Sequence, residues 1–114
     1  MSEKPKRPQQ VYTLLVEVGR KDGDGLPQAA SGAGLLCYAS GVTEGEAVRE
    51  TVALLKQAGL APLDVTGHGT LDERLKAGEE IGAEERKLMA RALAENSVIV
   101  ADTNVIYAGD QPPR

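Results

Sequence analysis

The residue best suited to acid–base chemistry is the single histidine of the chain, His68. It lies between Gly67 and Gly69 in a predicted turn, with Asp64 before it and Asp72 after it. An imidazole oriented by a carboxylate acts as a general base. We therefore treat His68, with Asp64 or Asp72, as a candidate catalytic set. The alternative is that His68 is an ordinary turn residue, because histidine tolerates unusual backbone angles.

The only cysteine, Cys37, is a second candidate for catalysis. A thiol acts as a nucleophile when a base lies within hydrogen-bond distance, and His68 is the one imidazole that the chain offers. Cys37 falls within a predicted apolar strand. The alternative is therefore that it serves as a small buried hydrophobic residue.

The sequence gives little basis for a metal or a cofactor. One cysteine and one histidine cannot supply the ligands of a structural zinc site. The run from Asp22 to Gly25 begins like a calcium loop, but continuing that loop places Leu26 and Ala33 where oxygen ligands are needed. The glycine-rich stretch does not lead from a strand into a helix, as a phosphate-binding loop would. We expect no metal and no cofactor.

Charge and hydropathy limit the classes of partner. Lys and Arg number 13 against 17 Asp and Glu, so the net charge is −4. An acidic domain is poorly suited to binding nucleic acid, because phosphates attract a concentrated positive field. No apolar run approaches the ~20 residues that cross a bilayer. The first ten residues carry Lys4, Lys6 and Arg7 and no apolar segment of a secretory signal. We expect a cytoplasmic protein without membrane contact.

Four segments have the composition of strands: residues 11–18, 35–40, 60–66 and 97–107. The third contains Pro62, which cannot donate to a strand ladder, so this strand is expected at an edge or to begin at Leu63. The last begins with an apolar run, from Val98 to Ala101, whose side chains are apolar on both faces. That pattern predicts a central strand.

Three helices are predicted between these strands. Thr43 and Glu46 have the spacing of a capping box, and so do Thr70 and Glu73. The first helix is expected to run to about Ala58, the second from Thr70 to Ala77, and the third over residues 83–95.

The predicted order is β-β-α-β-α-α-β. It is typical of an α+β domain with a mostly antiparallel four-stranded sheet and helices on one face. Residues 11–108 are expected to form this single domain, between disordered tails at residues 1–10 and 109–114.

The core is expected to be thin, because the chain has three Tyr and neither Phe nor Trp. Replacing aromatic side chains by Ala and Val reduces the apolar area that folding buries. A second copy that covers the other face of the sheet would compensate for this loss. The sequence therefore favours a homodimer.

The segment from Tyr38 to Val48 resembles the strand-to-helix junction of HicB-like antitoxin domains. The matching positions are Ser40, Thr43, Glu46 and Ala47, and the likeness extends over some 30 residues. The chain lacks the Pro-Gly-Cys approach of that family and any DNA-binding segment. The resemblance implies a local fold, and it implies a protein that neutralises a toxin by covering its site.

Three hypotheses about function follow. The first is a non-enzymatic, homodimeric interaction module with itself or another protein as partner. The second is a small-molecule binder or an enzyme centred on His68 with Asp64 or Asp72. The third is a HicB-like antitoxin. An interaction module requires an apolar surface patch, whereas an enzyme requires His68 in a pocket beside a carboxylate.

Overall fold

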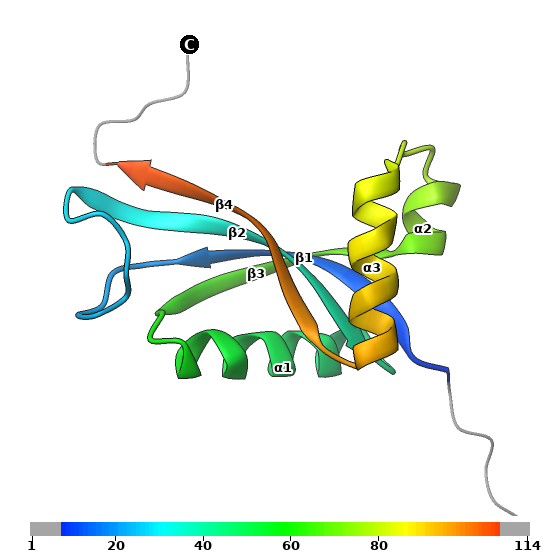
Figure 1. The fold of residues 1–114 in the computed structure, drawn as a ribbon, viewed down its shortest axis with the longest axis horizontal. Coiled ribbons are helices and arrows are strands. Elements are labelled where there is room, and N and C mark those ends of the chain that lie inside the picture. The colour runs from blue at the N-terminus through cyan, green and yellow to red at the C-terminus, as the bar shows by residue number, and fades with distance from the viewer. Residues whose placement is uncertain (1–7, 108–114) are drawn as a thin grey trace, which may run out of the picture.

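The computed structural model describes residues 8–107, which contain four strands and three helices (Figure 1). The strands are β1 (Gln10–Val18), β2 (Ala30–Gly41), β3 (Pro62–Thr70) and β4 (Val98–Tyr107). The helices are α1 (Glu44–Gln57), α2 (Leu71–Lys76) and α3 (Ala83–Glu95). The α+β class and the element order are as predicted. Of the two predicted tails, residues 1–7 and 109–114 lie outside the described part of the chain.

The strands form one antiparallel sheet in the order β3-β1-β2-β4. The edge position predicted for β3 from Pro62 is confirmed. The central position predicted for β4 is wrong, because β4 is the other edge strand. Its first residues are apolar on both faces because both α1 and α3 pack against this strand, and not because it has two strand neighbours.

Strand β2 begins at Ala30, earlier than predicted from the glycines of that segment. Gly32 lies so close to β1 that an added Cβ would be 2.4 Å from the Val18 carbonyl oxygen. Glycine is therefore required there by the close approach of two backbones, and it does not mark a mobile connection. The connection between the first two strands, which the predicted bounds place at residues 19–34, is therefore residues 19–29.

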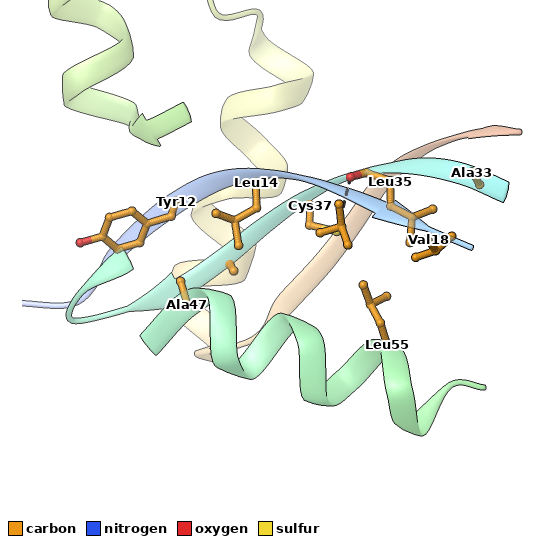
Figure 2. Packing of buried hydrophobic residues seen from close by; sticks show 10 residues of the cluster. Tyr12, Leu14, Val18, Ala33, Leu35, Cys37, Ala47 and Leu55 are labelled. Atoms are coloured by element: carbon orange, nitrogen blue, oxygen red, sulfur yellow. Dashed lines mark hydrogen bonds between the residues drawn. The ribbon is translucent and has the colours of Figure 1, made fainter. Parts of the chain in front are cut away.

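One face of the sheet is sealed by α1, and we call it the α1 face (Figure 2). Antiparallel pairing sets Leu14 opposite Cys37 and Val16 opposite Leu35 on this face. Ala47 and Leu55 of α1 pack onto the same cluster. Thr43 caps the helix by accepting a hydrogen bond from the Glu46 backbone N–H, as predicted.

The opposite face is covered in part by α3, and we call it the α3 face. A second buried cluster joins Val11 of β1 and Tyr38 of β2 to Ile81, Met89 and Ala92. The prediction that the helices lie on one face is therefore wrong: α1 and the α2–α3 pair lie on opposite faces (Figure 1). The reason lies in β2, where large apolar side chains occupy both alternate rows.

Tyr38 anchors the α2–α3 pair to the sheet. Its fully buried side chain donates a hydrogen bond from the hydroxyl to Glu85 Oε1 at 2.7 Å. Arg74 of α2 lies 3.7 Å from the same Glu85 oxygen and donates to Thr13 Oγ1 on β1 at 2.9 Å. Burial, and then the Glu85 hydrogen bond, raise the pKa of Tyr38 to about 12. One polar network therefore joins β1, β2, α2 and α3.

A second polar network fixes the loop between β1 and β2. The Arg20 guanidinium donates to both Asp24 oxygens and to the carbonyl oxygens of Pro27, Gln28 and Ala30. Asp24 also accepts hydrogen bonds from the backbone N–H groups of Lys21 and Leu26. The loop is thereby held against the base of the hairpin.

Removing the Tyr38 hydroxyl tests its role as an anchor. Tyr38→Phe is expected to lower the free energy of unfolding in urea by about 1–2 kcal/mol, because it leaves a partly buried carboxylate without its donor. Tyr12→Phe is the matched control, since the Tyr12 hydroxyl makes only a 3.4 Å hydrogen bond to the Val42 carbonyl. Equal losses in the two variants would contradict the anchoring role.

Asp24 predicts a dependence of stability on acid. The Arg20 hydrogen bond, and then the two backbone donors, lower the pKa of Asp24 from 3.8 to about 2. The pKa of Asp24 is lower in the folded protein than in the unfolded chain. Its contribution to the free energy of unfolding is therefore complete above about pH 4 and is lost as the pH falls towards about 2. We expect Asp24→Asn to be less stable than the wild type at neutral pH and to show a smaller further loss over that acid range. Parallel acid-unfolding curves for the two proteins would contradict this expectation.

Candidate functional site

His68 lies on β3, an edge strand, and not in the predicted turn. Gly67 is paired with Leu14 and Gly69 with Thr13, so a bulge leaves His68 between two paired positions. Its side chain is exposed. The neighbouring glycines have structural causes: a Cβ at Gly67 would meet the Glu44 carboxylate, and Gly69 has a φ of +90°.

The structure does not bring the predicted carboxylates to His68. Asp64 is exposed on the same strand, about 13 Å away at ~3.3 Å per residue, and Asp72 is exposed in the first turn of α2. Within residues 8–107, no ion pair joins His68 to either carboxylate. Asp64 and Asp72 line hollows on the surface of residues 8–107, but none of the four hollows has His68 in its lining.

Cys37 lies on the α1 face, buried in the aliphatic cluster of β1, β2 and α1 (Figure 2). Its thiol has the Leu35 carbonyl as its hydrogen-bond acceptor, at 4.0 Å. Burial raises the pKa of Cys37 to about 11, so the thiolate is disfavoured at neutral pH. Strand β1 separates Cys37 from β3, and the structure does not bring Cys37 and His68 together.

The described residues contain neither a group of three His, Cys, Asp or Glu side chains arranged to hold a metal ion nor a helix long and apolar enough to cross a membrane.

The sequence predicts one whole face of the sheet free of helices, whereas within residues 8–107 only a part of the α3 face is left uncovered by a helix. Helix α3 packs at the start of β1, and the sheet continues beyond it to Val18 (Figure 1). A hollow of about 260 Å³ lies on this end, and we call the surface around it the open half-face. Its lining includes the residues Leu15, Glu17, Asp64, Thr66, Asn104 and Ile106.

The open half-face combines exposed apolar side chains with acidic ones. Leu15 is 43% exposed and Ile106 is 38% exposed. Glu17 and Asp64 stand directly opposite each other on β1 and β3. Like charges in a cross-strand pair repel each other, and no Lys or Arg is among the residues that line the hollow. Side chains from Val11 to Glu17 alternate between the two faces of the strand, and this alternation could indicate a second apolar face. It does not show how far a helix covers that face.

The outer edge of β4 is a second exposed feature. Within residues 8–107, this strand pairs with β2 on one side and has no strand on the other. Val100, Ile106 and Tyr107 are large apolar residues exposed along it, and Asp102 is its only charged residue. An edge strand carries unpaired backbone N–H and C=O groups that can pair with another chain.

The sequence from residue 11 to residue 107 matches the family described as a domain of unknown function, DUF8846. This match covers nearly all of the described chain, so the protein belongs to the DUF8846 family. No curated protein and no solved structure matches the chain. Family membership assigns no activity, and the HicB-like resemblance stays a prediction.

The burial of Cys37 predicts its reactivity. The thiol of the folded protein is expected to react with a soluble disulfide reagent far more slowly than the same thiol in urea, because the side chain is buried and protonated. Absorbance of the released thiolate measures both rates. A folded-state rate close to the unfolded rate would restore Cys37 as a candidate nucleophile.

Proposed function

We propose that this protein is a non-enzymatic interaction module that forms a homodimer by antiparallel pairing of β4 with β4 of a second copy. The observation that carries the proposal is the unprotected outer edge of this strand. A free Cys37 is compatible with a reducing compartment, and we therefore propose the cytoplasm as its location.

Strand β4 has the composition of a strand that pairs at its edge. It is ten residues long, has no Pro, Gly, Lys or Arg, and consists mainly of β-branched residues. Natural edge strands are usually protected against pairing by lysines, prolines, bulges or short length. The pairing of β4 with β2 has two irregularities, one near the middle of β4, between the partners of Leu36 and Cys37, and one near its end, between the partners of Ala30 and Gly32.

Strand β3, the other edge, carries such protection. It begins at Pro62, which cannot donate to a ladder, and it contains Gly67 and Gly69. Its pairing with β1 has two irregularities, the same number as that of β4 with β2, so proline and glycine are what distinguish β3 from β4. The two edges of the same sheet therefore differ, and pairing is expected at β4 alone.

The sequence of β4 also suits pairing with itself. Apolar residues occupy both ends, from Val98 to Val100 and from Val105 to Tyr107, and polar residues occupy the middle. Antiparallel pairing reverses one strand, so apolar ends meet apolar ends and the polar middles meet each other. A dimer through the open half-face would instead bring Glu17 and Asp64 of two copies together, which charge repulsion disfavours.

Matched substitutions on the two edges test this dimer. Val100→Lys on β4 is expected to raise the dissociation constant of the dimer about tenfold or more, because it places a charge from each copy at the seam. Leu63→Lys on β3 is the control, since Leu63 is exposed even more, at 66% against 41% for Val100. Sedimentation equilibrium measures both constants.

The wild type and Leu63→Lys are expected to be dimers of equal affinity. A wild type that remains monomeric as its concentration rises would contradict the proposed function. A dimer that Val100→Lys leaves intact and Leu63→Lys dissociates would place the interface at β3 and would also contradict it.

A further inference from the structure

We infer that the open half-face binds a polypeptide segment of a partner protein that presents arginine beside apolar side chains. This inference concerns a different surface from the β4 edge and does not require the dimer. It rests on the hollow, on its exposed apolar residues and on the charges that rim it.

The composition of the hollow fits a polypeptide segment. Leu15 and Ile106 lie on β1 and β4, on the same face of the sheet, and both side chains are exposed. An exposed apolar group bounded by polar residues is typical of a surface that binds another protein. The polar side chains of Thr66 and Asn104 supply donors and acceptors at its rim.

The charges of the hollow determine the chemistry of its partner. Glu17 and Asp64 are paired across β1 and β3, where directly opposed Cβ atoms are about 5 Å apart. Carboxylates on side chains that begin this close together repel each other, and a cation bound to both reduces that repulsion. A guanidinium group presents donors along two edges and can bind both carboxylates, so arginine fits better than lysine.

A third acidic residue, Asp102, adds to the negative charge of this surface. Asp102 on β4 is paired with Leu36, whose side chain lies on the α3 face. The open half-face therefore bears Glu17, Asp64 and Asp102, and no ion pair to any of the three occurs within residues 8–107. Electrostatic complementarity of this kind favours a basic partner over a second copy of this acidic chain.

The probe for this inference is a synthetic ten-residue peptide that alternates arginine with leucine or valine. Nuclear magnetic resonance titration of the full chain is expected to shift the amide signals of Leu15, Glu17 and Asp64. Two further peptides serve as controls: one has every arginine replaced by glutamine, and the other has every apolar residue replaced by serine. Both are expected to bind more weakly, since each lacks one of the two required features.

The double variant Glu17→Gln with Asp64→Asn tests the proposed contact. It is expected to weaken binding of the arginine peptide about tenfold or more, because it removes both acceptors of the guanidinium group. The control is Glu50→Gln with Glu84→Gln, which changes the net charge equally at exposed sites on α1 and α3. Loss of fold does not explain the expected result, because removing the opposed charges is expected to leave the urea midpoint unchanged or higher.

Several results would overturn the inference. Amide shifts confined to other surfaces, or equal binding of the three peptides, would contradict it. Equal effects of the two double variants would contradict it as well. A synthetic peptide of residues 1–10 of this chain is a further probe, and binding by this peptide alone would also contradict the inference. The Val100→Lys variant, whose dimer is expected to be weaker, is expected to keep the affinity of the wild type for the arginine peptide. Its titration therefore separates failure of this inference from failure of the proposed dimer.

Discussion

The two inner strands must bury side chains on both faces of one sheet, and the rest of the structure depends on this constraint. On β2, Leu35 and Cys37 point to the α1 face, while Leu36 and Tyr38 point to the α3 face. A single helical layer leaves one of these rows in water. Helix α1, with Leu26 and Leu60, buries the first row, and the α2–α3 pair covers the second row only in part. Burial of both rows is the main apolar contribution to folding.

The partial cover is what gives the protein its exposed surfaces. Tyr38, Glu85 and Arg74 hold the α2–α3 pair at one end of the sheet, and the opposite end keeps Leu15 and Ile106 in contact with solvent. The two edge strands differ in composition. Strand β3 contains Pro62 and two glycines, whereas β4 contains neither proline nor glycine. We therefore assign recognition of a second copy to the β4 edge and recognition of a basic segment to the open half-face.

Local signals predicted the elements well, and long-range arrangement was harder to predict. The caps at Thr43 and Thr70 identified two helix starts, and Pro62 identified an edge strand. The apolar start of β4 predicted a central strand. That prediction was wrong because an edge strand covered by helices on both faces has the same apolar composition as a central strand. Gly32 suggested a loop because glycine serves a close backbone approach as readily as a turn. The opposition of Glu17 and Asp64 depends on register between distant strands, which spacing along the chain does not reveal.

The central claim is that the α3 face is sealed at one end and open at the other. It is tested most directly by relaxation of methyl signals with a soluble paramagnetic agent. Leu14 and Leu15 are neighbours on β1, and their side chains are 0% and 43% exposed. We expect strong relaxation at Leu15 and Ile106, with weak relaxation at Leu14 and at Met89, which α3 buries against the sheet. Equal protection of Leu14 and Leu15 in a monomeric sample would contradict the account, because it would require a helix over the surface that we describe as open.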